Sequence, residues 1–475
     1  MTATETSITL EQLRETLPPV WPQDLCGFIG KTVADSTTKL VILDDDPTGT
    51  QTVHDIPVLT TWSIEVLENE LKTCGPGFFI LTNSRSLVPS AAQALSRKLG
   101  TNLRRALTGA GVSVQIISRS DSTLRGHYPG EVDALMQALG PSDLPRILIP
   151  CFFEGGRYTA NDIHYVSEGE RLLPAAQTPY ARDAAFGYRH SNLREWVAEK
   201  TGGSVAADRI MSVSIEDIRL GGPEAVTNRL LSLSPGDCCI VNALEYRDLE
   251  VFTAGLLAVE SQGRAFVFRS AASFVRVRAG IRPRDLLDRE TMGVDHSGRG
   301  GLFVVGSYVP KTNTQLAALR NRKNIVDVEV KVDTLLDVLR QPPAVAAAIA
   351  AANQAIESGL DAVVFTSRGL VTGRDVYGSL NIGRRVSDSL IAIVQGISCR
   401  PRFLVAKGGI TASDVATKGL GVRRAIVMGQ VLPGVPVWRL GSETRWPGLA
   451  YIVFPGNVGD EGALATISRC LEPVR

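Results

Sequence analysis

Several features that identify common protein classes are missing from this sequence of 475 residues. The seven cysteines are scattered and include no Cys-x-x-Cys motif, and the five histidines include no His-Glu-x-x-His motif. These absences argue against a zinc site and against a disulfide framework. We therefore interpret the cysteines as reduced core thiols.

Neither charge nor hydrophobicity is concentrated as in nucleic-acid-binding or membrane proteins. Lys and Arg number 50 and Asp and Glu number 49, so the net charge of +1 creates no overall field for nucleic acid or anionic lipid. No apolar run approaches the ~18 residues of a membrane-spanning helix, and the opening MTATETSITLEQL lacks the pattern of a secretory signal. We expect a cytoplasmic protein without nucleic-acid or membrane partners.

Two common nucleotide-binding motifs are also absent. No Gly-x-x-x-x-Gly-Lys-[Ser/Thr] loop and no Gly-x-Gly-x-x-Gly fingerprint occurs in the chain. Aromatic residues make up only 6% of the sequence, whereas glycine occurs 45 times. This composition is typical of an α/β enzyme with many tight strand-to-helix turns.

Short apolar runs alternate with helical segments along most of the chain. The runs are KLVILDD, GFFILTN, SVQIISR, RILIP, DCCIVNA and RAFVFR, followed by GGLFVVGSY, NIVDVEVKV, DAVVFTS, RFLVAKGG, RAIVMGQV and LAYIVFPG. Continuous apolar strands alternating with helices predict mainly parallel sheets covered by helices.

The alternation lapses in polar, Gly-rich text between the two groups of strands. The length and this lapse predict an α/β protein of two domains, each built on a mainly parallel sheet, with the active site in the cleft between them. We expect a helical N-terminal extension at 1–36, a first domain at 37–280, a linker at 281–299 and a second domain at 300–475.

Three consecutive aspartates follow the first strand of the first domain. Ligands of an open parallel sheet bind beyond the carboxyl ends of its strands. Asp44, Asp45 and Asp46 repel one another there, so we expect at least one of them to be functional. Asp44 continues the apolar run and could turn inward, whereas Asp46 precedes Pro47 and could only shape or cap the turn.

A second polar cluster, SRSDSTLRGHYPGE, follows the strand SVQIISR. Asp121, Ser122 and Thr123 supply acceptors and hydroxyl donors, although either hydroxyl could instead cap a helix. Arg125 supplies a planar fork that suits a carboxylate, and Gly126 lets the backbone approach a ligand closely. This density of polar residues favours a binding site.

A third cluster, EGGRYTANDIHYV, follows RILIP and supplies Arg157 and Asp162. Because the three clusters follow three strands of one predicted sheet, they could converge on one ligand. The residue types suit a small, hydroxylated anion.

The strand ends of the second domain are Gly/Ser/Thr turns that open onto helices. They read GSYVPKTNTQ, TSRG, AKGGITASDV and FPGNVGDEGAL, and residues 408–411 form the strongest of them. Such turns present free N–H groups and a helix dipole to phosphate. One Gly-Gly turn alone is weak evidence, but an acid-binding domain beside a phosphate-binding domain suggests phosphoryl transfer.

At these residues the sequence resembles the four-carbon acid sugar kinase family. The matching stretches are DDDPTGT, SDSTLRGHYPGE, the loop with Arg157, VVGSY, AKGGITASDVATKGLGV and FPGNVGDEGAL, in family order. The resemblance implies an ATP-dependent kinase of carbohydrate catabolism that phosphorylates a hydroxyl of a small sugar acid, such as threonate, erythronate or a related aldonate. It also implies that Mg²⁺ is carried with the nucleotide, and a homo-oligomer is compatible with it.

The resemblance also implies roles for individual residues. Asp45 and Asp121 are the candidates for the aspartate that orients or deprotonates the attacking hydroxyl, and the motif does not decide between them. The protein itself is expected to supply no metal ligand. The substrate side comprises Asp46, Arg119, Ser122, Thr123, Arg125 and Arg157, and the nucleotide side comprises Ser307, Gly408, Gly409, Ile410, Thr411 and Gly456.

Four stretches depart from the family pattern. They are the N-terminal extension, the longer text DPTGTQTVHD, the text GSYVPKTN, and Asn242, which stands where an aspartate is common. The extension and Asn242 could change which acid is accepted.

Two other functions fit parts of the sequence. VILDDDPTGT fits the DxDxT motif of haloacid-dehalogenase-type phosphatases, with Asp44 as nucleophile, Asp46 as general acid, and Thr366, Lys407 and Asp460 completing the set. Against it, the paired acid after Asp460 is missing and DSTLRGH is left unexplained. The other alternative is a non-catalytic two-domain sensor of sugar acids.

Overall fold

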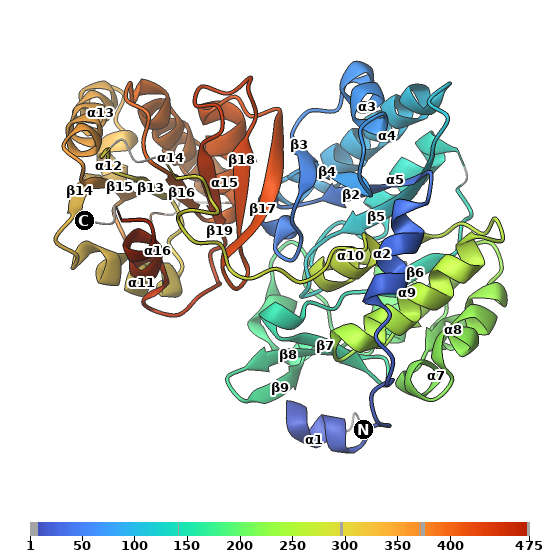
Figure 1. The fold of residues 1–475 in the computed structure, drawn as a ribbon. Coiled ribbons are helices and arrows are strands. Elements are labelled where there is room, and N and C mark those ends of the chain that lie inside the picture. Colours follow the sequence, from blue (N-terminus) through green and yellow to red (C-terminus); the bar gives the residue numbers. More distant parts are fainter. Residues whose placement is uncertain (1–7, 141, 295–297, 370, 372–375, 473–475) are drawn as a thin grey trace. The chain divides into compact units, whose positions relative to one another are not determined.

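The computed structural model describes residues 8–140, 142–294, 298–369, 371 and 376–472. The chain divides into two compact units, which are described separately (Figure 1). The first unit comprises Met1–Thr52 and Thr61–Pro283, and the second comprises Val53–Thr60 and Arg284–Arg475.

The first unit is built on a parallel sheet of order β10-β11-β6-β12-β5-β2-β4. Its central strands are continuous apolar runs and are buried, as the sequence predicts for a sheet covered on both faces. The strands are β2 (Thr38–Asp44), β4 (Gly77–Leu81), β5 (Ser113–Arg119), β6 (Arg146–Ile149), β10 (Met211–Val213), β11 (Cys238–Val241) and β12 (Val267–Ser270). The helices after the extension are α3 (Ile64–Leu71), α4 (Pro89–Leu107), α5 (Gly130–Leu139), α6 (Leu193–Lys200), α7 (Ile215–Arg219), α8 (Gly222–Leu231), α9 (Tyr246–Glu260) and α10 (Ala272–Arg278).

A second, antiparallel sheet in this unit was not predicted. Its order is β1 (Ile8–Thr9), β9 (Arg171–Pro174), β8 (Ile163–Glu168) and β7 (Arg157–Ala160). The N-terminal extension therefore contributes an edge strand as well as two helices, α1 (Leu10–Glu15) and α2 (Cys26–Ala34). Helix α2 packs against α9 and α10, which anchors the extension to the first unit.

The second unit is built on a mixed sheet of order β3-β17-β18-β19-β16-β13-β15-β14. Strands β19, β16, β13, β15 and β14 are parallel, whereas β3, β17 and β18 pair antiparallel at one side. The strands are β3 (Ile56–Leu59), β13 (Leu302–Val305), β14 (Ile325–Val330), β15 (Asp361–Thr366), β16 (Leu404–Lys407), β17 (Arg424–Leu432), β18 (Val435–Leu440) and β19 (Ala450–Phe454). The helices are α11 (Pro310–Arg320), α12 (Val332–Leu335), α13 (Gln341–Glu357), α14 (Val376–Gly396), α15 (Gly409–Asp414) and α16 (Ala463–Cys470).

Strand β3 belongs to the second unit, although its residues were predicted to lie in a first domain at 37–280. Its residues pair with β17, from Ile56 opposite Val427 to Leu59 opposite Arg424. Asp55, just before the strand, forms a salt bridge with Arg284 at the start of the main part of this unit. Backbone pairing across more than 360 residues of sequence therefore determines where β3 lies.

The predicted fold class is confirmed, because both units are α/β with mainly parallel strands. All seven cysteines are free. Cys74 and Cys470 are exposed, so the interpretation of every cysteine as a core thiol was wrong for these two. Among the helices that the structure describes, none is long and apolar enough to cross a membrane.

Candidate active site

The first aspartate of the triplet is structural. Asp44 ends β2 and is only 1% exposed, and its Oδ1 accepts a hydrogen bond from Nη1 of Arg119 at 3.2 Å. A Cβ at Gly49 would lie 1.9 Å from this oxygen, so the turn passes over the carboxylate at a distance that only glycine allows. Burial raises the pKa of Asp44, and the ion pair with Arg119 opposes that rise.

Asp46 shapes the turn that follows. Its Oδ1 accepts a hydrogen bond from the backbone N–H of Thr48 at 2.9 Å and so caps the short helix η1 (Pro47–Thr50). Its second oxygen lies 3.4 Å from Nη2 of Arg85. Asp46 therefore combines a cap, as its place before Pro47 suggests, with an ion pair.

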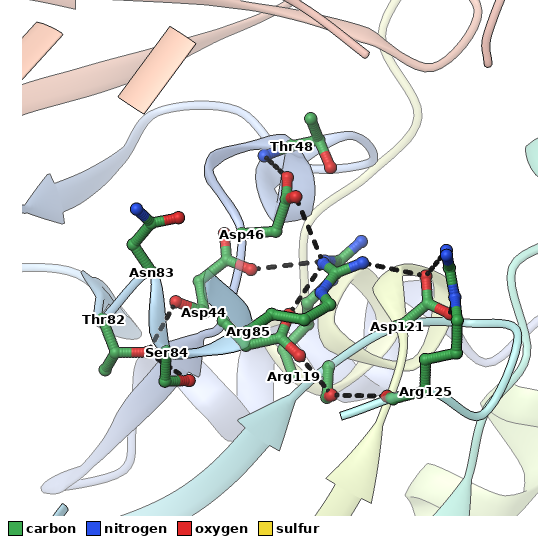
Figure 2. Close-up of polar contacts among 12 residues, drawn as sticks. Asp44, Asp46, Thr48, Thr82, Asn83, Ser84, Arg85, Arg119, Asp121 and Arg125 are labelled. Carbon is green, nitrogen blue, oxygen red and sulfur yellow. Dashed lines mark hydrogen bonds and ion pairs between the residues drawn. The ribbon is translucent and has the colours of Figure 1, made fainter. Parts of the chain in front are cut away.

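Arg85, which was not among the predicted site residues, brings the carboxylates of Asp45 and Asp121 together. Its Nη2 donates to Oδ1 of Asp45 at 3.0 Å and its Nη1 donates to Oδ1 of Asp121 at 3.2 Å. Figure 2 shows this guanidinium between the aspartates of two strand ends. Burial lowers the pKa of Arg85, but the charges of Asp45, Asp46 and Asp121 outweigh it and raise the pKa above its usual value.

The position of Arg85 follows from the end of β4. Asn83 adopts a left-handed conformation, with φ of 50°, and starts the short helix η2 (Ser84–Ser86). Asparagine tolerates this conformation better than most residues. Because β4 lies next to β2 in the sheet, the turn brings Arg85 to the aspartates.

Asp45 is nearly buried at 4% exposure, and both of its oxygens are bound. Oδ1 accepts from Arg85, and Oδ2 accepts from the hydroxyl of Ser120 at 2.5 Å. Asp45 and Glu131 line one small cavity. Burial raises the pKa of Glu131 to about 7, with a contribution from the charge of Asp45. Part of the Glu131 population is therefore uncharged at neutral pH, which limits the negative charge near Asp45.

Asp121 carries more donors than Asp45. Its oxygens accept from Nε of Arg125 at 2.9 Å, from Nη2 of Arg125 at 3.2 Å, and from Arg85. The backbone N–H of Thr123, at 3.2 Å, and the Thr123 hydroxyl donate as well. Burial raises the pKa of Asp121, but the ion pairs with Arg125 and Arg85 outweigh it and hold this pKa well below its usual range.

A strained residue fixes the loop that carries Asp121. Leu124 has φ of 69°, which is unfavourable for a leucine, and its side chain is buried in an apolar cluster with Tyr188 and Trp196. The carbonyl of Thr123 accepts from the Tyr188 hydroxyl at 2.8 Å. This anchoring orients Thr123 and Arg125 on either side of Leu124.

Two of the predicted substrate-binding arginines share one aromatic ring. The guanidinium of Arg125 lies 5.0 Å and that of Arg157 lies 5.8 Å from the centre of the Tyr180 ring. Arg125 also lies 3.5 Å from Asp183. The structure thus brings Arg157 into the same site as Arg125, as the convergence of the polar clusters predicts.

The other predicted substrate-side residues lie in different surroundings. Arg119 is 3% exposed and its guanidinium bonds to Asp44 and Gln51, so it supports the turn from beneath. The carbonyl of Ser122 accepts from the ring of His164 at 2.7 Å, and burial lowers the pKa of this histidine to about 4. His164 is therefore neutral and positions the Ser122 backbone.

Asp162 has a structural role. Its carboxylate accepts from Arg194 at 2.6 Å, from Ser212 at 2.5 Å and from the Asn242 amide at 2.9 Å. The Asn242 side chain in turn accepts from the backbone N–H of Asp162. Asn242, which departs from the family pattern, is 1% exposed, and its side chain bonds within this network.

In the second unit, three of the predicted nucleotide turns meet. Gly408, with φ of 114°, lies so close to Ser307 that a Cβ would be 3.0 Å from the Ser307 Cβ. The Ser307 hydroxyl bonds to that of Thr312 at 3.0 Å, and Thr312 donates to the carbonyl of Gly456 at 3.4 Å. Helix α15 begins at Gly409 and contains Thr411, and Ile410 is 60% exposed.

Lys407 supports these turns from within the unit. Its ammonium is fully buried and donates to the carbonyls of Pro455, at 2.6 Å, and Gly456, at 3.3 Å. It also lies 3.8 Å from the centre of the Phe454 ring. Burial lowers the pKa of Lys407 to about 7, and the positive charge of Lys311 lowers it further.

Comparison with known families matches both parts of the chain. Residues 40–278 match a sugar-binding N-terminal domain, and residues 302–464 match a nucleotide-binding C-terminal domain. A D-erythronate kinase of Heliobacterium modesticaldum is 28% identical over 265 residues, which cover 55% of this chain and 54% of that protein. A 3-oxo-tetronate kinase of Methylobacterium radiotolerans is 25% identical over 376 residues, which cover 76% and 81% respectively. The chain thus spans about half the length of the first relative.

Two solved structures share the fold. A Salmonella typhimurium protein named as a tRNA synthase has a TM-score of 0.66 at 18% identity, covering 91% of this chain and 99% of that one. A Haemophilus influenzae protein of the domain-of-unknown-function family 1537 has a TM-score of 0.61 at 16% identity, covering 91% and 100%. At these identities the likeness shows the fold alone.

The two family matches define a protein with a sugar-binding unit followed by a nucleotide-binding unit. The chain belongs to the four-carbon acid sugar kinase family. The position of Asp44 does not fit the haloacid-dehalogenase-type alternative. Asp44, which would be its nucleophile, is buried against Arg119.

Proposed function

We propose that this protein is an ATP-dependent kinase that phosphorylates a hydroxyl of a four-carbon sugar acid such as erythronate, threonate or 3-oxo-tetronate. The observation that carries the proposal is the cluster in which Arg85 holds Asp45, Asp46 and Asp121 beside the paired guanidinium groups of Arg125 and Arg157. Cations suit the carboxylate of the acid, and aspartates suit its hydroxyls. The names of the two relatives and the nucleotide-binding match support the same reaction class.

The nucleotide is proposed to bind at Ser307, residues 408–411 and Gly456. Gly408 and Gly456 leave backbone surface near Ser307 without side chains, and the turn at 408–411 opens a helix. Mg²⁺ bound to the nucleotide would supply neutralisation of phosphate charge at these turns.

Asp45 is the proposed base. The substrate hydroxyl oxygen attacks the γ-phosphorus, the bond from phosphorus to the β–γ bridging oxygen breaks, ADP leaves, and the hydroxyl proton passes to the carboxylate. Asp121 is a poor proton acceptor, because two arginines hold its pKa well below the usual range. Asp45 has a hydrogen bond from one arginine, Arg85, and is therefore the better proton acceptor. Asp121 binds Arg125 and is proposed to position that arginine for the acid.

The test is ADP formation by the full chain with ATP and a panel of four-carbon acids, with the product identified by mass spectrometry. We expect Asp45→Asn to lower kcat by ~10²-fold or more, the scale of general-base loss, and Asp121→Asn to act mainly on KM for the acid. Asp388→Asn, at an exposed site of α14, is the matched control.

Each alternative predicts a different result. Binding of an acid without ADP formation indicates the sensor, and phosphate release without ATP indicates a phosphatase. Near-normal kcat in both folded variants, Asp45→Asn and Asp121→Asn, would remove the proposed assignment of the base.

A further inference from the structure

Arg368 is a cation without an acidic partner beside the proposed nucleotide turns. It follows β15, and its Nε donates to the side-chain oxygen of Asn313 at 2.8 Å. Its Nη2 donates to the carbonyl of Ser307. Its Nη1 is buried and has no hydrogen-bond partner among the residues that the structure describes. Two of its three nitrogens therefore fix the guanidinium, and the third is left for a ligand.

The lack of a counter-ion distinguishes the half-buried Arg368 from the buried Arg402 of the same unit. Arg402 pairs with Asp361 at 3.0 Å, whereas no carboxylate of the described residues lies within ion-pair distance of Arg368. Burial lowers the pKa of Arg368, yet a guanidinium remains charged in proteins. An unpaired charge that is partly removed from water is unfavourable, so the site is arranged for an anion.

Two lysines bind the carbonyls of the neighbouring turn at 455–457. The ammonium of Lys311 donates to the carbonyl of Asn457 at 3.3 Å, and Lys407 donates to the carbonyls of Pro455 and Gly456. In the part of the chain that the structure describes, neither lysine forms a salt bridge. Arg368 joins the same group through Ser307, whose hydroxyl bonds to Thr312 next to Lys311.

We propose that Arg368 binds the phosphate chain of the nucleotide, with Nη1 as the donor held ready for a phosphate oxygen. The inference rests on the proposed function, because it assigns a further residue to the same nucleotide site. A nucleotide phosphate fits better than the acid substrate, because Arg368 lies within residues 302–464, which match a nucleotide-binding domain. A planar guanidinium also matches the oxygens of a phosphate group.

The test is calorimetric titration of the full chain with adenosine, AMP, ADP and ATP, in wild type, Arg368→Gln, Arg368→Lys and the control Arg320→Gln. Arg320 lies on α11 in the same unit and pairs with Asp327 in an exposed ion pair, so the control removes one positive charge elsewhere. We expect Arg368→Gln to weaken ADP and ATP binding by about tenfold to hundredfold and to leave adenosine binding unchanged. Arg368→Lys retains the charge but not the fork, and its affinities are expected to lie in between.

The outcomes separate this inference from the proposed function. Failure of the wild-type chain to bind ATP or ADP overturns both. Wild-type binding of ATP with no loss in Arg368→Gln overturns the role of Arg368 alone. Equal weakening of all four ligands shows that Arg368 merely holds Ser307 and Asn313 in place, which also overturns the inference. If Arg368→Gln does not fold, the same comparison across the four ligands in Arg368→Lys decides between these results.

Discussion

Nucleotide binding is expected to make Lys407 take up a proton. Burial lowers the pKa of Lys407 to about 7 in the free protein. Near pH 8, only about a tenth of the Lys407 side chains therefore carry the proton and its positive charge. Lys407 directly precedes the turn at 408–411 and binds the carbonyl of Gly456. Phosphates bound at these turns would favour the ammonium and raise its pKa.

The sign and size of the effect follow from linkage. Because the pKa is higher in the bound state, affinity is greatest below about pH 7 and falls as the pH rises through the pKa of the free protein. If the bound ammonium stays protonated, about 0.9 proton is taken up per nucleotide near pH 8, and affinity falls by up to about tenfold per pH unit above that value. The charge of Lys311 lowers the pKa of Lys407 in the free protein and so enlarges the uptake.

The assay is calorimetry of ATP binding near pH 8 in buffers of different ionisation enthalpy. At this pH the phosphates of ATP are already ionised, so uptake reports on the protein. Lys407→Met should abolish the dependence on buffer and flatten the pH profile. Equal binding heats in all buffers for the wild-type chain would contradict proton uptake, because Lys407 would then keep the same protonation state with and without nucleotide.

Two predictions concern the sugar-binding unit. In Gly126→Ala, at φ of 122°, the new Cβ would lie 2.6 Å from the Ser120 hydroxyl and 3.2 Å from Oδ2 of Asp45. We therefore expect kcat/KM for the acid to fall by about tenfold or more, and the affinity for ATP to stay unchanged. Gly111→Ala, at φ of 68° with open space around its Cβ, is the control for backbone strain, and equal losses in both variants would contradict the contact with Asp45. Arg125→Lys keeps the charge but loses the two-bond contact with Asp121, so the KM for the acid should rise by a factor corresponding to about 1.5–3 kcal/mol. An equal rise in the KM for ATP would contradict acid recognition by Arg125.

Most of the parallel strands could be predicted because they are continuous apolar runs followed by polar turns, whereas the three-residue strand β10 was not predicted. Strand β3 could not be predicted, because its four residues include a proline and their partner β17 is distant in sequence. The antiparallel sheet of β7, β8 and β9 lies in text whose polar residues suggested a binding loop. Local patterns carry no information about which distant strand supplies the hydrogen bonds.

The candidate site was predictable only in part for the same reason. Asp45, Asp121 and Arg125 follow strands and stand in recognisable motifs. Arg85 stands in the text TNSRS after GFFILTN, and the polar end of that strand was the signal that could have found it. Arg119 is buried, and Asp162 bonds to Arg194, Ser212 and Asn242, through contacts with distant parts of the chain. These contacts cannot be read from the sequence, and the polar side chains alone therefore predicted binding roles for both residues.

The route of the chain through β3 has a consequence for exchanging parts between relatives. The chain passes from one unit to the other after Thr52, after Thr60 and again after Pro283. A chimera joined near residue 283 would combine the second unit of one parent with a β3 strand from the other parent. The two residues of the Arg284–Asp55 ion pair would then come from different parents. A fragment that begins at residue 284 would leave the edge of β17 unpaired and open to association with other chains. To transfer the complete nucleotide-binding unit, a chimera must also include residues 53–60, which lie within the sequence of the sugar-binding unit.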